Sequence, residues 1–90
     1  MSHVLVTTKH RGVFFGKLKE DKGATVILEQ ARNCVSWDQA TRGFLGLATT
    51  GPTSGCRIGP AAPELTLYGV TSIATCSDEA VKAWERAPWI

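Results

Sequence analysis

The 90-residue sequence lacks several features that would place it in a specialised class of protein. It contains no run of 18 apolar residues, so no membrane-spanning helix is expected. Its first residues show no basic segment followed by an apolar one, so no secretory signal is expected and we predict a cytoplasmic location. The sequence also has no large excess of positive or negative charge. It contains ten Lys and Arg and eight Asp and Glu, which gives a net charge of +2. Since duplex binding usually requires a clustered basic patch, nucleic acid is possible as a partner but not favoured.

Cysteine is sparse, and its spacing is wide. Cys34, Cys56 and Cys76 are an odd number and lie far apart in the chain. A disulfide framework would need an even number of cysteines, and a zinc site would need Cys or His pairs at short spacing. We therefore expect free thiols that are buried or half-buried, and we expect no metal and no cofactor.

The apolar residues are numerous enough to drive folding. They make up 43% of the sequence and include three tryptophans, which argues against disorder. A chain of this length forms one domain, here residues 1–90. Because so short a chain buries only about 60% of its unfolded surface, we expect a homo-oligomer to be a means of further stabilisation.

The first third of the sequence has the alternation and the turn residues of β-strands. Strands are predicted over residues 3–8, 12–19 and 24–29. The second and third form a hairpin through Asp21-Lys22-Gly23. Gly16, inside this hairpin, indicates a β-bulge or a close approach of the backbone. Residues 31–37 either prolong the third strand or bend away from it.

A helix is expected to begin near Ser36 or Asp38. Ser36 with Gln39 matches a capping box, and Asp38 is an alternative cap. The expected apolar face of this helix consists of Ala40, Phe44, Leu47 and Ala48.

The remaining segments contain a loop, short strands and a second helix. We predict a loop over residues 49–55, at most a short strand over 56–59, and one bent strand or two short ones over 64–76, interrupted at Gly69. Ser77 is predicted to cap the last helix, with Asp78 and Glu79 in its first turn. Its apolar stripe is expected to consist of Ala80, Val81, Trp84 and Ala87.

The order β-β-β-α-β-β-α predicts an α+β fold with mostly antiparallel pairing. The expected architecture is a strongly bent sheet, or a small and partly open barrel, of five to six strands with two short helices.

No arrangement of residues typical of an enzyme is found in the sequence. Gly12 and Gly16 precede a lysine, but the Gly-Lys-Ser/Thr signature of a phosphate loop is missing. Cys76, directly before a helix, is better placed than Cys34 to be a nucleophile, but a structural role is favoured for both. We therefore expect a protein that is not an enzyme and has no catalytic residues.

The groups that remain are suited to binding. Arginine binds carboxylate or phosphate through two parallel hydrogen bonds, and aromatic rings offer a flat surface to a base. The arginines lie at or near the ends of predicted elements, where side chains can converge on an anion. The candidate ligand-binding residues are Arg11, Arg32, Trp37, Arg42, Arg57 and Tyr68. The alternative for each arginine is a surface charge, and for Trp37 a place in the core.

A succession of short motifs extends over nearly the whole chain. It comprises Val4, Gly12-Val-Phe-Phe-Gly-Lys-Leu, Val26-Ile-Leu-Glu-Gln-Ala-Arg, Trp37, Ala40, Leu47-Ala48, Gly51, Cys56-Arg57-Ile58, Leu67, Val70, Ile73, Cys76-Ser77, Ala80 and Pro88-Trp89. This succession resembles a family of small uncharacterised proteins encoded by bacteriophages and prophages. The resemblance implies a phage origin and carries no assigned activity. The segment Thr41-Arg-Gly-Phe is more glycine-rich than that pattern.

A weaker similarity is to Sm-like domains. It rests on Gly12-Val-Phe-Phe-Gly-Lys-Leu, Val26-Ile-Leu and Tyr68-Gly-Val-Thr-Ser-Ile. It implies a bent sheet, an oligomer and RNA binding, although a long insertion between residues 31 and 63 departs from it.

The resemblance to phage and prophage proteins, taken with the lack of catalytic groups, implies a phage-encoded binding protein that acts stoichiometrically in counter-defence. It would sequester a nucleotide-type immune signal or block a host defence protein. The first version implies an oligomer with pockets and convergent arginines, and the second implies an exposed apolar or charged patch. The alternatives are an Sm-like module that binds RNA or single strands, and a virion or assembly accessory protein.

Overall fold

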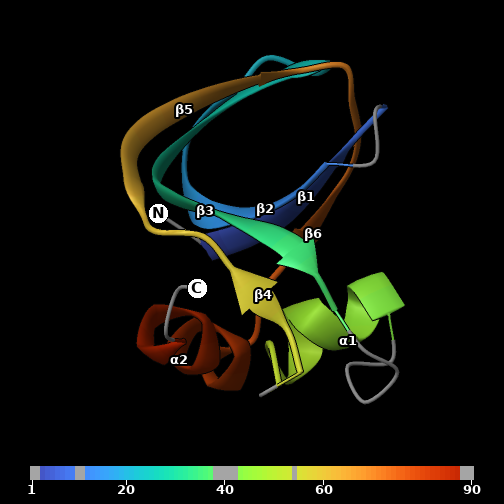
Figure 1. The fold of residues 1–90 in the computed structure, drawn as a ribbon. Helices are drawn as coiled ribbons and strands as arrows, with labels where there is room; N and C mark the ends of the chain where they lie inside the picture. Colours follow the sequence, from blue (N-terminus) through green and yellow to red (C-terminus); the bar gives the residue numbers. More distant parts are fainter. Residues whose placement is uncertain (1–2, 10–11, 38–42, 54, 88–90) are drawn as a thin grey trace.

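The computed structural model describes residues 3–9, 12–37, 43–53 and 55–87 (Figure 1). Its elements are β1 (His3–Thr8), β2 (Val13–Asp21), β3 (Thr25–Ser36), α1 (Gly43–Thr49), β4 (Arg57–Ile58), β5 (Ala62–Tyr68), β6 (Val70–Thr75) and α2 (Asp78–Arg86). The predicted α+β class is confirmed, and the two-residue strand β4 makes the order β-β-β-α-β-β-β-α. Among the described residues, no helix is long and apolar enough to cross a membrane.

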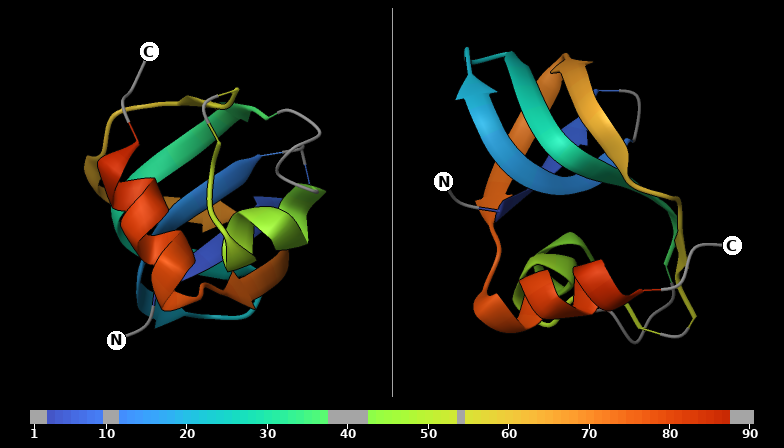
Figure 2. Two further views of the ribbon diagram at one scale, coloured as in Figure 1. Left: turned by 90° about the horizontal axis from the view of Figure 1, so that it is seen from below. Right: turned by 90° about the vertical axis from the view of Figure 1, so that its left-hand side faces the viewer.

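The six strands form one strongly bent antiparallel sheet that does not close. The strand order is β4-β3-β2-β1-β6, and β5 also pairs with β3. Since β2 occupies one edge of β3, β4 and β5 follow each other along its other edge. β5 and β6 therefore lie at opposite edges of the sheet although only Gly69 separates them, and the sheet curls between them (Figure 2). This is the partly open barrel that the sequence predicts.

The predicted hairpin is confirmed, and its second strand is longer than expected. At its turn, the backbone N–H of Gly23 donates to Asp21 Oδ1 over 2.9 Å, and Lys22 donates to the Thr25 carbonyl. β3 continues to Ser36, which decides between the two interpretations of residues 31–37. Its last residues remain extended because β4 pairs with them, Ser36 lying opposite Arg57.

The predicted start of the first helix at Ser36 is wrong. Ser36 is the last residue of β3, where pairing with β4 replaces the helical capping that a local pattern suggested. Asp38, Gln39 and Ala40 lie outside the described residues. The helical face is confirmed where it is described, since α1 buries Leu47 and Ala48, and Phe44 packs against the same core.

The second helix begins as predicted, and it also donates hydrogen bonds to the last carbonyls of the first helix. Ser77 Oγ accepts a hydrogen bond from the Ala80 N–H over 3.1 Å, which is an N-cap. The Ser77 N–H donates to the Ala48 carbonyl, and Trp84 Nε1 donates to the Leu47 carbonyl over 3.0 Å. The last carbonyls of α1 have no partner within their own helix. The short, glycine-containing α1 is therefore held by hydrogen bonds from the N-cap and the last turn of α2.

The two faces of the bent sheet cover two separate cores. The outer face packs on both helices, and its core residues are Leu5, Val13, Phe15, Cys34, Leu47, Ala48, Cys56, Ile58, Ala80 and Trp84. The inner face curls around a second core of Val4, Val6, Val26, Leu28, Ala31 and Leu67. β1 shows the alternation directly, since Leu5 faces the helices while its neighbours face inward.

Candidate functional site

A β-bulge in β3 decides which side chains face the helices. Phe15 pairs with Arg32 and Lys17 with Glu29, so the segment of β3 has one residue more than the segment of β2 opposite it. Gln30 is the extra residue of this bulge. Its φ is +50°, and among the described residues it is the one non-glycine residue with positive φ. Strict alternation from Val26 would turn residue 32 toward the inner core. The bulge instead turns Arg32 toward α2.

Gly16 lies on β2 opposite this bulge. A Cβ at this position would be 3.0 Å from the Leu28 Cβ and 3.1 Å from the Glu29 carbonyl oxygen. The sequence predicted a bulge or a close backbone approach at Gly16, and the structure has the close approach at Gly16 with the bulge opposite it on β3.

The Arg32 side chain is buried between the sheet and α2. Arg32 is 6% exposed, and among the described residues it is the one charged or polar residue that is buried. Nε donates to the Gly59 carbonyl over 2.8 Å, and Nη1 donates to the Trp84 carbonyl over 2.6 Å. The Trp84 carbonyl belongs to the last turn of α2, where the helix dipole favours a positive charge.

The charge of Arg32 has no carboxylate partner in the part of the chain that the structure describes. Its Nη2 atom is buried and makes no hydrogen bond to a described residue. Burial lowers the pKa of the guanidinium, because the charged form is separated from water. Arginine nevertheless stays protonated in proteins. Arg32 is therefore a buried positive charge with one unsatisfied donor, and an acceptor from outside reaches Nη2 only after neighbouring side chains move.

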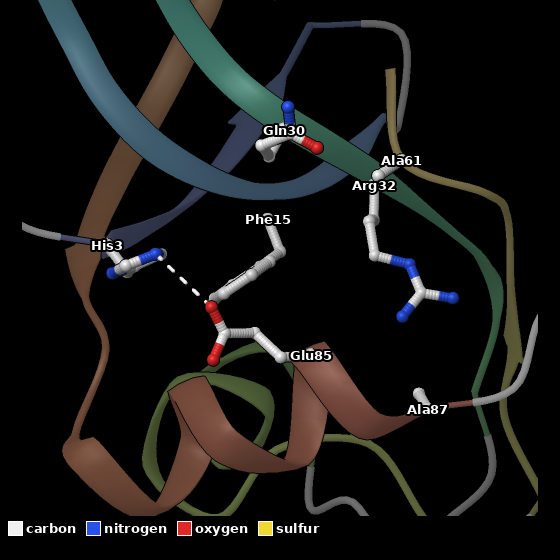
Figure 3. Close-up of a pocket in the computed structure, with 7 residues that line it drawn as sticks. All are labelled: His3, Phe15, Gln30, Arg32, Ala61, Glu85 and Ala87. Atoms are coloured by element: carbon white, nitrogen blue, oxygen red, sulfur yellow. Dashed lines mark ion pairs between the residues drawn. The ribbon is translucent and has the colours of Figure 1, made fainter. Parts of the chain in front are cut away.

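Arg32 lines a cavity of about 280 Å³ between the sheet and the end of α2 (Figure 3). The lining residues are His3, Phe15, Gln30, Arg32, Ala61, Glu85 and Ala87. Ligand pockets range from about 300 to 1,000 Å³, so this cavity suits a small molecule or one part of a larger one.

Two lining residues, Phe15 and His3, belong to an aromatic stack whose third ring, Trp84, is fully buried and does not line the cavity. Phe15 stacks on Trp84 with ring centroids 5.0 Å apart, and on His3 with centroids 5.5 Å apart. His3 Nε2 lies 3.8 Å from Glu85 Oε2. Figure 3 shows the His3–Glu85 pair on one side of Phe15 and the Arg32 guanidinium on the other. Phe15 is engaged in both of these stacks, and its ring is therefore less open to a nucleobase than its place in the cavity lining suggests.

Comparison with known proteins gives one finding. A family model described as domain of unknown function DUF6948 matches residues 1–84. The chain belongs to the DUF6948 family. No curated protein and no solved structure matches this chain.

In this DUF6948 domain, the four predicted ligand-binding residues that the structure describes do not converge on one site. Arg32 lines the cavity, although it lies inside β3 and not near the end of an element as predicted. Trp37, 42% exposed and therefore not in the core, follows β3, and the exposed Arg57 is on the paired strand β4. Tyr68, 73% exposed, pairs with Thr25 at the opposite end of β3. Arg11 and Arg42 lie outside the described residues.

Sequence reasoning missed most of the cavity. His3, Phe15, Gln30 and Glu85 come from β1, β2, β3 and α2, and their spacing in the DUF6948 sequence follows no motif. The glycine at position 16 was the one local sign of the bulge. It indicated a backbone irregularity but not which side chains would be brought together.

The thiols of the DUF6948 domain are free and buried or half-buried, as predicted. Burial raises the pKa of Cys34 to about 12 and that of Cys76 to about 11. A thiol with a raised pKa is protonated near neutral pH and is a poor nucleophile. This supports the structural role that was favoured for both residues.

Proposed function

We propose that this DUF6948 protein is a non-enzymatic binding protein that takes a small molecule with an anionic group into the cavity beside Arg32. The observation that carries the proposal is the buried guanidinium, which lines the cavity, has no carboxylate partner among the described residues and retains an unpaired Nη2. An unsatisfied buried donor is costly, and more so when it is charged. An oxygen anion supplied by a ligand would remove this cost.

The wider role proposed for the protein is stoichiometric sequestration. Its support is the resemblance of the sequence to small phage and prophage proteins, together with a site whose described lining includes Arg32 and contains no serine, threonine, lysine or cysteine. In this role the protein would be phage-encoded, act in the host cytoplasm as a homo-oligomer, and remove an anionic immune signal. A nucleotide-type signal would place its phosphate at Arg32 and extend its remaining parts out of the small cavity.

The first experiment is native mass spectrometry of the protein purified from a bacterial lysate, beside a denatured sample. One small bound molecule for each chain supports the proposal and identifies the ligand class, and the same spectrum gives the oligomeric state. The purified protein is then heated with acetate, inorganic phosphate or a nucleoside monophosphate, with sodium chloride at matched ionic strength as control. A ligand present at 100 times its Kd stabilises the native state by about 2.7 kcal/mol. No bound mass, together with no anion that raises Tm above the chloride control, would refute the proposal.

A second candidate function is to block a host defence protein. Trp37 and Val35, 42% and 60% exposed, lie at the end of β3, and the exposed Arg57 is on the neighbouring strand. Trp and Arg are frequent among residues that dominate binding energy at interfaces. This version expects that Trp37→Ser abolishes capture of a host protein. Tyr68→Ser, on β5 opposite the far end of β3, should leave capture unchanged. Equal capture by both variants would remove this surface from consideration.

The Sm-like module that binds RNA and the virion accessory protein stay predictions. No contact or charge cluster among the described residues favours either.

A further inference from the structure

The cavity contains groups of both charges. Arg32 provides a positive charge at one end, and Glu85 provides a carboxylate at the other, where it lies beside the ring of Phe15 (Figure 3). Within the described residues no nitrogen of Arg32 lies within 4.0 Å of a carboxylate oxygen, so the two charges do not neutralise each other by direct pairing. Ala61 and Ala87 add apolar surface to the lining.

Glu85 has capacity to accept further hydrogen bonds. Its one ion-pair partner among the described residues is His3, at 3.8 Å. This distance exceeds the usual 2.7–3.2 Å of a hydrogen bond from nitrogen to oxygen. An ionised carboxylate accepts through both oxygens, and an ammonium group supplies three donors. Glu85 is therefore placed to receive a cationic group of a ligand whose anionic group is at Arg32.

We infer that the cavity binds a small zwitterion, with its carboxylate at Arg32, its ammonium group at Glu85 and a short apolar spacer beside the edge of Phe15. This inference rests on the proposed function and specifies the class of its ligand. The charges of Arg32 and Glu85 sum to zero, which matches a ligand that is neutral overall. A phosphate dianion would gain the same contact with Arg32 but would share the cavity with the negative charge of Glu85.

The aromatic stack supports the same class of ligand. Stacking of a nucleobase requires an exposed ring face. Phe15 is engaged in stacks with His3 and Trp84, and Tyr68 and Trp37 do not line the cavity. An aliphatic spacer needs only apolar surface, which the ring edge and the two alanines provide.

The test is an NMR titration of the whole protein with three series of ligands. The first contains zwitterions of increasing spacer length: glycine, β-alanine, 4-aminobutanoate, 5-aminopentanoate and 6-aminohexanoate. The second contains the acids without the amino group, and the third the amines without the carboxylate. Because Glu85 is 59% exposed, and exposed ion pairs contribute about 0.2–1 kcal/mol, the best zwitterion should bind up to about fivefold more tightly than its matching acid. The amines should bind most weakly.

Glu85→Gln tests the assigned contact without removing Arg32. In this variant the Kd of the best zwitterion should equal the Kd of its matching acid. Binding of the acid itself should be unchanged or slightly tighter. Glu79→Gln is the matched control, because Glu79 is an exposed glutamate in the first turn of the same helix and does not line the cavity. It should keep the preference of the native protein. Unchanged melting temperatures and spectra establish that both variants are folded.

Each outcome bears on one of the two proposals. A zwitterion preference that disappears in Glu85→Gln and persists in Glu79→Gln supports the inference. Equal binding of acids and zwitterions, a preference that survives Glu85→Gln, or a phosphate monoester that binds more tightly than every zwitterion overturns it, while leaving an anion site at Arg32. If no anion and no zwitterion binds at all, the proposed function itself fails.

Discussion

Trp84, on α2, contacts both α1 and the cavity residue Phe15. Its replacement therefore tests how the two helices are held against the sheet. Trp84 is completely buried, stacks on Phe15, and donates from Nε1 to the Leu47 carbonyl over 3.0 Å. Trp84→Phe keeps an aromatic ring but removes the donor. A buried acceptor left without its partner costs about 1–3 kcal/mol. The smaller ring leaves roughly 40 Å³ empty, which at about 24 cal/mol per Å³ costs about 1 kcal/mol more.

We therefore expect Trp84→Phe to lower the free energy of unfolding by about 2–4 kcal/mol. For a chain of this size, each 1 kcal/mol lowers Tm by about 4–8 °C. Urea denaturation followed by far-UV circular dichroism measures the loss without relying on tryptophan fluorescence. Trp37→Phe is the control, because Trp37 is 42% exposed and a surface change usually stays within about 0.5 kcal/mol. Equal losses in the two variants would refute the role assigned to the Leu47 hydrogen bond.

Three further predictions concern the sheet, the helix junction and the thiols. Gly16→Ala should destabilise by about 1–3 kcal/mol in a urea titration, because its Cβ would approach Leu28 too closely. Ser77→Ala should cost about 1–3 kcal/mol in the same assay, because it removes the N-cap of α2 and the Ser77 hydroxyl contact to α1. With the folded pKa of Cys34 at about 12 and that of Cys76 at about 11, against an ordinary value of 9.0, the protonated thiols favour the folded state. Their stabilisation is complete below the ordinary value and is lost as pH rises through the folded values, so Tm measured from pH 8 to 11 should fall.

Each of these predictions has a matched comparison. Gly23→Ala, in the hairpin turn, meets nothing within 4 Å, and its cost comes from its positive φ alone. A loss in Gly16→Ala no larger than in Gly23→Ala would contradict the close packing at the bulge. Thr71→Ala, on the exposed edge strand β6, controls for loss of a hydroxyl that caps no helix. For the thiols, Cys34→Ala should show a shallower fall of Tm with pH, and an identical slope would contradict the assigned cause.

The sequence by itself determined the features that depend on neighbouring residues. Three local features were predicted: the hairpin turn at Asp21-Lys22-Gly23, the cap at Ser77 and the buried stripe of α2. Each of them depends on residues that are close to one another in the sequence. The bent, incompletely closed sheet followed from the order of short strands. The exception among local patterns was Ser36, where pairing with β4 outweighed a match to a capping box.

The tertiary structure alone decided where the binding groups meet. Arg32 was predicted as a candidate binding residue, and one extra residue at Gln30 determines that it faces α2 and not the inner core. Its cavity is completed by His3 and Glu85, which are more than 80 residues apart in sequence. Trp37 and Tyr68 were chosen for the chemistry of their rings, yet they lie at opposite ends of β3, with Tyr68 opposite Thr25 and Trp37 directly after Ser36. Side-chain chemistry is readable from a residue type, whereas the meeting of residues from four elements depends on pairing register, and a single bulge changes that register.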